Sequence, residues 1–347
     1  HIIGQRLFVR RDLQQVQYRR PLARVALQVL APVVKGLPGK GIANDVAGGF
    51  PVFHQFLGGG EARVPGELRL PDMFEQALDA ARSMQPDAVI GFGGGSPMDV
   101  AKVLAALHNS DQTILDVTGI DLLDTRTTYL VCIPTTSGTG SEVTPYAIFH
   151  HEEEQLKKGV VSPHIVPDAS YVDPKLTVTM PPSVTAATGM DAMTHSIEAY
   201  VNRYSHPMVD MYALESIRLI AANLPIAVQH GDDLAARSAM SLGSLYGGLC
   251  LGPVNTGAVH ALAYPLGGEF HVAHGVSNSV LLPHVAAFNM SAVPERYAEI
   301  GIAMGAEQGA TPTETAEVAI ELIRSLSREI GIPSGMAELD VPEDAIP

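Results

Sequence analysis

The sequence predicts two domains, an α/β domain with a parallel sheet followed by an all-helical domain. A chain of 347 residues is long enough for two hydrophobic cores. Between residues 70 and 174, helical segments alternate with short apolar segments typical of buried strands, the order that builds a parallel sheet. After about Met180 the strand signals fade and helical segments follow one another. We therefore expect an α/β domain over residues 1–179 and a helical domain over residues 180–347.

The expected elements follow from periodicity and turn signals. Residues 73–85 place Phe74, Leu78 and Ala81 on one face with charged residues opposite, which predicts an amphipathic helix. The segment DAVIGFGG predicts a buried strand, and residues 96–109 predict the helix after it. The other expected elements are strands at 128–136 and 169–174 and helices at 181–201, 207–228, 234–251 and 313–331.

The first 70 residues differ from the rest in charge and pattern. They carry ten Lys or Arg and four Asp or Glu, a net charge of +6, whereas the remaining residues carry twelve and thirty-three, a net charge of −21. Gly and Pro interrupt them repeatedly, and they yield no βαβ unit. Because the chain opens at His1 without Met, we expect a clipped or partial product.

Composition narrows the class of protein. The chain is 46% hydrophobic and 17% charged, as in ordinary globular proteins, and its net charge of −15 argues against nucleic acid or anionic membrane as a partner. No apolar run approaches the ~18–20 residues that a membrane span requires. Cys132 and Cys250 lie in apolar segments without a CxxC motif, so we expect reduced core thiols in a cytoplasmic protein.

Four ionisable residues stand out because the sequence around them is apolar or small. Asp191 and His195 lie four residues apart on a predicted helix, so they project from the same face. The other two are His260 and His274. One carboxylate and three imidazoles suit a divalent transition metal such as Fe(II) or Zn(II), with a position left for a substrate oxygen. The alternative is that each histidine is an ordinary core or surface residue.

The spacing of the two later histidines requires a break in the chain. On one unbroken helix His260 and His274 would lie about 21 Å apart, too far to share an ion. Pro265, Gly267 and Gly268 between them predict that break and let the chain fold back.

Two polar loops follow predicted strands. In GFGGGSPMDVAK, Gly93 to Gly95 allow backbone to approach a ligand, and Ser96 as N-cap before Pro97 would open a helix whose N–H groups suit a pyrophosphate. A well-capped helix without a ligand is the alternative. The second loop, PTTSGTGSEVTP, crowds hydroxyls that suit a ribose or phosphate, unless it is a simple Ser/Thr-rich turn.

These motifs, with GMDAMTHSIEAY and HALAYPLGGEFHVAHGVSNSVLLPH, resemble the iron-containing (group III) alcohol dehydrogenases over roughly residues 72–335. The resemblance implies an N-terminal α/β domain that binds NAD or NADP and a helical C-terminal domain that holds Fe(II) or Zn(II), the fold of the dehydroquinate synthases. It implies metal ligation by Asp191, His195, His260 and His274. The cofactor-binding residues that it implies are Gly94, Gly95, Ser96, Pro97, Met98, Asp99, Thr135, Thr136, Gly138, Thr139, Ile148 and Lys157.

The chain departs from that family in three places. Relatives carry a histidine four residues after the third ligand where this chain has Tyr264, so proton relay falls to Tyr264 or to another group such as His271. Residues 1–70 lack the family's opening strands and the acidic residue that contacts the ribose, which leaves NAD versus NADP open. Relatives also continue beyond Pro347 through further helices, so we expect a C-terminal truncation.

The resemblance implies a metal-dependent alcohol dehydrogenase that transfers hydride between a small alcohol and nicotinamide, as a homodimer or larger homo-oligomer. No Arg lies near the metal motifs to bind a carboxylate, which favours uncharged alcohols. Two alternatives remain: a folded but inactive partial family member, and a lyase of the dehydroquinate-synthase type.

Overall fold

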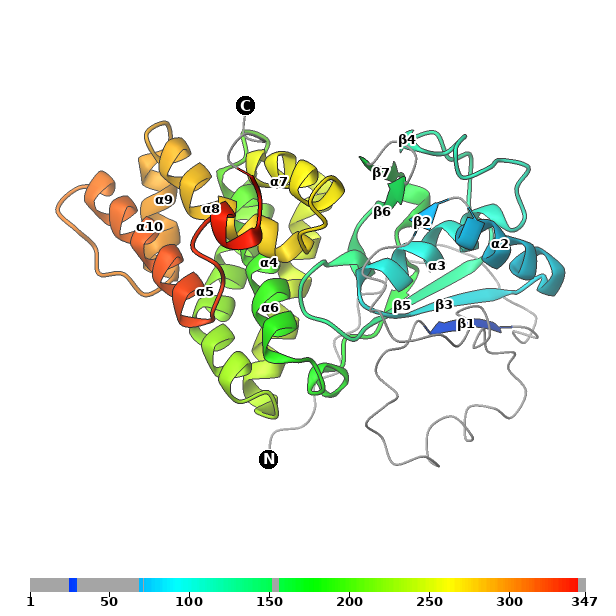
Figure 1. Ribbon diagram of the computed structural model, residues 1–347, viewed down its shortest axis with the longest axis horizontal. Helices are drawn as coiled ribbons and strands as arrows, with labels where there is room; N and C mark the ends of the chain where they lie inside the picture. Colours follow the sequence, from blue (N-terminus) through cyan, green and yellow to red (C-terminus); the bar gives the residue numbers. More distant parts are fainter. Residues whose placement is uncertain (1–24, 30–68, 71, 152–155, 343–347) are drawn as a thin grey trace. The chain divides into compact units, whose positions relative to one another are not determined.

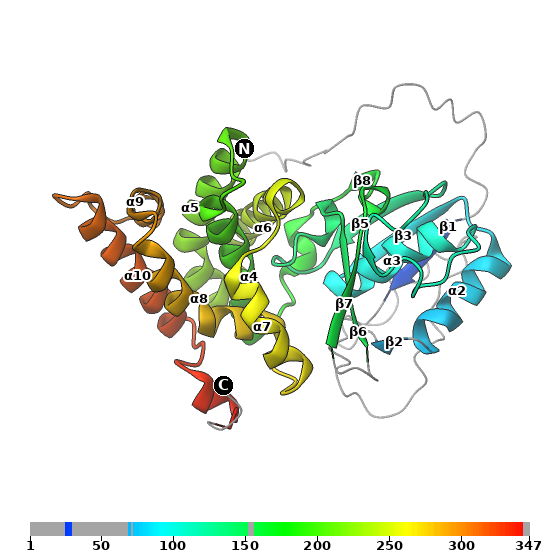
Figure 2. The same cartoon turned by 90° about the horizontal axis from the view of Figure 1, so that it is seen from above.

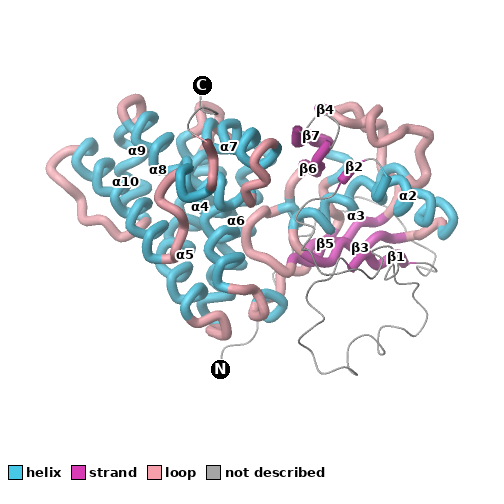
Figure 3. The backbone as a smooth tube through the Cα atoms, viewed as in Figure 1, coloured by secondary structure: helices cyan, strands magenta, loops and turns pink. Residues whose placement is uncertain are grey.

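The computed structural model describes residues 25–29, 69–70, 72–151 and 156–342, and these divide into two compact units. The first lies within residues 1–135 and 141–173, and the second within residues 136–140 and 174–347. In the described residues every strand belongs to the first unit, as the magenta segments of Figure 3 show, and the long helices after residue 180 belong to the second. The predicted fold class is therefore confirmed. The expectations for the rest of residues 1–70 lie outside the described residues.

A parallel sheet forms the centre of the first unit. Its strand order is β1-β3-β5-β8, and every neighbouring pair is parallel. Helix α3 packs along this sheet (Figure 1). The close approach depends on Gly91, where a Cβ would lie 2.9 Å from the Cβ of Ala101. The elements are β1 (Val25–Val29), α2 (Asp72–Met84), β3 (Ala88–Gly93), α3 (Gly95–Leu107), β5 (Tyr129–Pro134) and β8 (Ala169–Ser170).

A second, mixed sheet was not expected from the sequence. Its order is β2-β6-β7-β4, and β6 and β7 pair antiparallel, side by side in Figure 2. The short connection between β6 and β7 explains the pairing, since parallel neighbours need a longer crossover. Its strands are β2 (Arg69–Leu70), β4 (Gly119–Ile120), β6 (Tyr146–His151) and β7 (Leu156–Val161). Among the described residues, the short 3₁₀ helices are η2 (Ser141–Val143), η3 (Pro163–Ile165), η4 (Pro174–Thr177) and η5 (Met336–Leu339).

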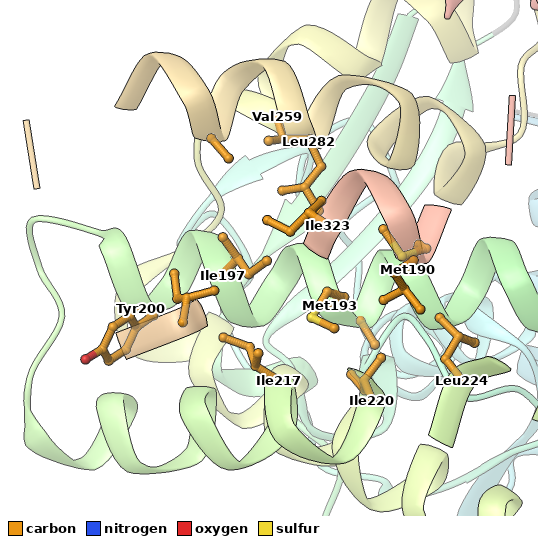
Figure 4. Packing of buried hydrophobic residues seen from close by; sticks show 14 of the residues in the cluster. Met190, Met193, Ile197, Tyr200, Ile217, Ile220, Leu224, Val259, Leu282 and Ile323 are labelled. Carbon is orange, nitrogen blue, oxygen red and sulfur yellow. The ribbon is translucent and has the colours of Figure 1, made fainter. Parts of the chain in front are cut away.

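The second unit packs its helices around a core centred on α4. Met190, Met193 and Ile197 of α4 face Ile217 and Leu224 of α5 in Figure 4, and all five are buried. Burial of this apolar face stabilises the unit and fixes which side of α4 carries its polar residues. The helices are α4 (Pro182–Val201), α5 (Pro207–Gln229), α6 (Leu234–Val254), α7 (Ala258–Gly268), α8 (His274–Met290), α9 (Pro294–Ala303) and α10 (Pro312–Glu329).

Helix α5 is apolar enough to pass a test for membrane spans. It is the one described helix that meets the criteria of length and composition. It also packs against α4 and α6 and contributes Ile217, Ile220 and Leu224 to the core, which is the behaviour of a core helix.

The predicted break between His260 and His274 exists, but it lies after the predicted positions. Pro265 lies inside α7, and the helix ends only at Gly268. A short connection follows, in which His271 has a φ of 55°, and α8 begins at His274. Pro265 is tolerated because a proline in a helix removes one N–H bond, and packing of α7 against α8 offsets this loss.

Candidate metal centre and nucleotide loop

The four ionisable residues singled out in the sequence converge inside the second unit. Asp191 and His195 come from α4, His260 from α7 and His274 from the first position of α8. The Oδ1 atom of Asp191 lies 3.9 Å from Nε2 of His195 and 3.7 Å from Nε2 of both His260 and His274. The carboxylate thus stands at the meeting point of three imidazoles.

Burial and charge set the protonation of this cluster. Burial lowers the pKa of His195 by more than the Asp191 carboxylate and the Gly138 backbone raise it. For Asp191, burial alone would raise the pKa, but the adjacent imidazoles of His195, His274 and His260 outweigh it and hold the pKa well below its usual range. The cluster therefore combines an ionised carboxylate with a neutral imidazole at His195, the forms that bind metal.

Glu198 also belongs to the site and was missed in the sequence. Its Oε2 lies 2.6 Å from Nδ1 of His260, and its two oxygens accept the backbone N–H groups of Gly257 at 2.9 Å and Val259 at 2.6 Å. A Cβ at Gly257 would meet Oε1 at 2.8 Å. Its position was the signal that could have revealed it in the sequence. Asp191, His195 and Glu198 lie on one face of α4 at helical spacing.

Glu198 fixes which nitrogen of His260 faces the cluster. Burial alone would lower the pKa of His260, but hydrogen bonds with Asp191 and Glu198 outweigh burial and raise it. A proton on Nδ1, shared with Glu198, leaves Nε2 as the atom that faces Asp191. Carboxylate–histidine pairs of this kind orient metal ligands in many proteins.

Asn278 is the second residue that the sequence did not reveal. It is fully buried on α8, one turn after His274. Its Nδ2 lies 2.7 Å from Oδ1 of Asp191, 3.0 Å from Nε2 of His260 and 3.3 Å from Nε2 of His274.

The donor set fits a divalent transition metal. Atoms bonded to one ion at about 2.1 Å in a tetrahedral arrangement lie about 3.4 Å apart. The observed spacings of 3.7–3.9 Å around Asp191 are only slightly wider. Asp191, His195 and His260 alone already form a buried group with ligand atoms within 4.8 Å of one another. His274 completes the set from a more exposed position, since its side chain is 33% exposed.

Tyr264 lies one turn after His260 on α7 and is 38% exposed. Burial, and then the charge of Glu198, raise the pKa of its phenol above the ordinary value, so it stays neutral near neutral pH. A neutral phenol can donate a proton or a hydrogen bond but is a poor base. His271, the other relay candidate, lies in the connection between α7 and α8.

The glycine-rich loop begins α3 earlier than predicted. The N-cap is Gly94, and Ser96 lies inside the first turn, so the expectation that Ser96 caps the helix was wrong. Pro97 has no N–H, and the N–H of Met98 bonds the carbonyl of Gly94, which places the cap there. No side chain caps this N-terminus, so the N–H groups of its first turn are not taken up by a cap.

The two polar loops leave the same edge of the parallel sheet. Gly93 and Pro134, the last residues of β3 and β5, are paired, and the N–H of Thr135 bonds the carbonyl of Gly93 at 2.8 Å. Gly93 has a φ of 149°, and a Cβ there would meet Pro97 at 2.7 Å. Ligands of open α/β sheets bind at this carboxyl edge.

The carboxylate of Asp99 is engaged within the first unit. It accepts the hydroxyl of Ser141 at 2.6 Å and the N–H of Ile148 at 3.0 Å, and it lies 3.8 Å from Nζ of Lys102. The structure therefore brings together two candidate cofactor residues, Asp99 and Ile148. Lys157, the third from this region, lies on β7 beside β6, opposite His150.

The middle of the second polar loop packs with the helical unit. Ser137 shares a hydrogen bond of 3.1 Å with Ser241 of α6. A Cβ at Gly138 would lie 2.7 Å from the Cβ of Thr188. Gly140 has a φ of 63°, and a Cβ there would lie 2.4 Å from the Cα of Gly248. Candidate residues Gly138 and Thr139 thus belong to the unit that carries Asp191 and the histidines around it.

Known proteins are similar to this chain both in sequence and in fold. The family model for iron-containing alcohol dehydrogenase matches residues 63–174, and the model for the C-terminal part of the Fe-containing alcohol dehydrogenase family matches residues 185–347. A 1,3-propanediol dehydrogenase of Klebsiella pneumoniae is 42% identical over 273 residues, which cover 78% of this chain and 70% of that protein.

A second relative and a solved structure are similar to the chain as well. The NAD-dependent methanol dehydrogenase of Bacillus methanolicus is 37% identical over 272 residues, covering 78% of this chain and 71% of the relative. A crystal structure of a 1,3-propanediol oxidoreductase superposes with a TM-score of 0.82 at 37% identity, covering 92% of this chain and 83% of the other. The chain belongs to the iron-containing alcohol dehydrogenase family.

Proposed function

We propose that this protein is a metal-dependent, NAD(P)-linked dehydrogenase that interconverts a small uncharged alcohol and its aldehyde or ketone. The observation that carries the proposal is the convergence of Asp191, His195, His260 and His274, with three imidazole Nε2 atoms 3.7–3.9 Å from one carboxylate oxygen. Membership of the family supports the reaction class, and the names of the propanediol and methanol dehydrogenases support an alcohol as substrate.

The four ligands would hold Fe(II), or alternatively Zn(II). Such an ion, when bound, supplies Lewis acidity toward a substrate hydroxyl oxygen. The chain's own residues do the rest: Asp191 contributes the single negative charge among the ligands, and Glu198 holds His260 in the tautomer whose Nε2 faces inward. Tyr264 and His271 are the proposed groups for moving a proton at the rim of this site.

The glycine-rich loop is the proposed nucleotide site. The first turn of α3, from Gly94 through Asp99, would bind the pyrophosphate through backbone N–H groups. Thr135, Thr136, Gly138 and Thr139 would line the nicotinamide, with Ile148 and Lys157 completing the site. The NAD dependence named for the methanol dehydrogenase relative supports a nicotinamide dinucleotide, and the choice between NAD and NADP is part of the test.

The charge around the ligands favours an uncharged substrate. No Lys or Arg occurs between residues 176 and 202 or between residues 238 and 295, the segments that contain all four ligands. A substrate carboxylate would find no cationic partner from these segments, so we propose ordinary small alcohols and diols rather than hydroxy acids. We further propose a cytoplasmic location and a homodimer or larger homo-oligomer.

The test is a substrate panel on protein of defined metal content. Chelator-treated protein and protein loaded with Fe(II) or Zn(II) are assayed with small alcohols and diols, with NAD and with NADP. Activity restored by metal and highest with uncharged alcohols supports the proposal. Equal rates in chelated and loaded protein overturn the metal dependence. NADH binding is measured by NADH fluorescence. Protein that binds metal but not NADH is an inactive family member.

A further inference from the structure

Asn278 occupies a place among the proposed ligands that the reaction does not account for. Its amide nitrogen is within 2.7–3.3 Å of one atom from each of Asp191, His260 and His274. Its side chain is completely buried, and its Oδ1 has no hydrogen-bond partner among the described residues. The side chain is thus held by its amino end alone, in contact with three of the four donors.

The bonds of Asn278 use the electron pairs that a cation requires. The amide nitrogen of Asn278 can only donate, so its 3.0 Å contact with Nε2 of His260 requires a lone pair on that imidazole nitrogen, while Nδ1 of His260 faces Glu198. An imidazole nitrogen has one lone pair, which can accept an N–H or bind a metal but not both. The same holds for Nε2 of His274, whereas a carboxylate oxygen such as Oδ1 of Asp191 can serve both.

We propose that Asn278 is a placeholder for the metal ion. In metal-free protein its two N–H groups, shared among Asp191, His260 and His274, hold these residues with their lone pairs turned inward, and metal entry releases the amide from the imidazoles. The proposal rests on the proposed function, because it takes these residues as ligands. It assigns Asn278 a positioning role that stabilises the metal-free form selectively and keeps the donors together between loading events.

A buried amide that only fills space would behave differently. Its removal would destabilise metal-free and metal-loaded protein alike, since its contacts would be the same in both. A placeholder contributes mainly without metal, because in loaded protein the cation takes over the imidazole lone pairs. By linkage, removing a group that stabilises only the metal-free form must tighten metal binding.

The experiment compares Asn278→Leu and Asn278→Ala with the wild type and with Ser277→Ala. Ser277 is the matched control, since it is also fully buried on α8 but bonds only to the carbonyl of Ala273 in its own helix. The Tm of each protein is measured after chelation and after loading with Zn²⁺ or, without oxygen, Fe²⁺. Zn²⁺ affinity is measured by competition with a chelating dye.

The expected result is that the Asn278 variants lose Tm mainly in the metal-free form, so that the rise in Tm on loading exceeds that of the wild type. Their Zn²⁺ affinity should increase roughly tenfold, because the metal-free form loses the stabilisation of one or two hydrogen bonds. Ser277→Ala should shift both forms equally. Equal losses in both forms, or weaker Zn²⁺ binding, overturn the placeholder role. A wild type whose Tm ignores both metals overturns the proposed metal site itself.

A measurement on unmodified protein covers the case in which the variants do not fold. With ¹⁵N-labelled asparagine, the side-chain amide of Asn278 should exchange slowly with solvent without metal and shift on addition of Zn²⁺, as its bonds to His260 and His274 are lost. An unchanged signal on saturation with Zn²⁺ overturns the proposal.

Discussion

The carboxylate of Glu198 joins His260 to the start of its own helix. Oε2 lies 2.6 Å from Nδ1 of His260, and the carboxylate also accepts the N–H groups of Gly257 and Val259, where α7 begins. The hydrogen bonds from His260 and from the backbone lower the pKa of Glu198 although burial alone would raise it. One residue of α4 thus places α7 and orients the imidazole that α7 carries.

Replacing Glu198 with Gln should weaken metal binding by roughly 10–100-fold, because the acceptor that orients His260 loses its charge. The metal affinity is measured by competition with a chelator, and far-UV circular dichroism checks that the helices persist. Glu215→Gln, which removes an exposed partner of Arg218, is the control and should bind metal as the wild type does. Unchanged affinity in Glu198→Gln would contradict the orienting role.

His260→Ala and Tyr264→Phe should separate ligation from proton handling. His260→Ala removes a buried metal-ligand candidate, so the variant should lose bound metal. Elemental analysis after gel filtration measures the metal content. Tyr264→Phe should retain metal and change only the rate or its pH profile, since the phenol is neutral and it is Glu198 and Asn278 that contact the ring nitrogens of His260. Loss of metal from Tyr264→Phe would show that Tyr264 supports the ligands directly.

Ser96→Glu should weaken NADH binding by about tenfold or more. The new carboxylate would lie in the first turn of α3 and occupy or repel the position proposed for the pyrophosphate. NADH affinity is measured by fluorescence titration. Ser83→Glu on the exposed surface of α2 adds the same charge and should leave affinity unchanged. Equal effects of the two changes would indicate general electrostatics and argue against this loop as the binding site.

Gly140→Ala should lower the free energy of unfolding by about 2 kcal/mol or more. Its φ of 63° strains any side chain, and the new Cβ would lie 2.4 Å from the backbone of Gly248. Urea unfolding followed by circular dichroism provides the measurement. Gly335→Ala, with nothing within 4 Å and an extended backbone, should change stability by no more than about 0.5 kcal/mol. Similar losses in both variants would refute the close packing of this loop.

The carboxyl of Glu142 should make the stability of the first unit depend on pH. Burial raises its pKa from 4.5 to about 7, although the charge of Lys102 lowers it in part. Since the folded pKa exceeds the unfolded one, this contribution to stability is complete below pH 4.5 and is lost as the pH rises through about 7. Lys102 is already 3.8 Å from Asp99, so an ionised Glu142 is an additional buried charge.

Glu142→Gln stays neutral and should remove this dependence. Between about pH 5 and about pH 8 the variant should gain roughly 2 kcal/mol of unfolding free energy relative to the wild type. Urea unfolding at both pH values measures the difference. Parallel pH profiles for the two proteins would mean that Glu142 stays ionised in the folded state.

Local patterns predicted the local structure well. The strand β3 and helix α3 lie where the apolar segment and the glycine-rich turn after it placed them, within a few residues. The antiparallel pair β6–β7 was missed, since its pairing depends on contacts between segments and its apolar pattern is interrupted by two histidines and two lysines. Helices α7 and α8 were obscured by Pro265 and Pro283, which signal a break in isolation but are tolerated where neighbouring helices pack against them.

For the site, too, relationships within one helix were predictable from the sequence and contacts between helices were not. Asp191 and His195 were predictable as neighbours because four residues span one helical turn. Glu198 and Asn278 escaped notice because their partners are distant in sequence: Glu198 contacts His260 62 residues away, and Asn278 contacts Asp191 87 residues away. Helical spacing places Glu198 on the same face of α4 as His195, but its contact with His260, like that of Asn278 with Asp191, arises only when α4, α7 and α8 pack together.

The packing of residues 136–140 with the helical unit has a consequence for biosynthesis. Ser137 bonds Ser241 across 104 residues, and Gly140 lies against Gly248, so the loop is made long before its partners. Residues 136–140 can pack only after α6 has been synthesised. Bringing segments about a hundred residues apart together costs conformational entropy before the contact forms. A fragment that begins at residue 174 would fold without these five residues. The first half of the chain therefore supplies part of the packing of the helical unit, and residues 174–347 alone lack that part.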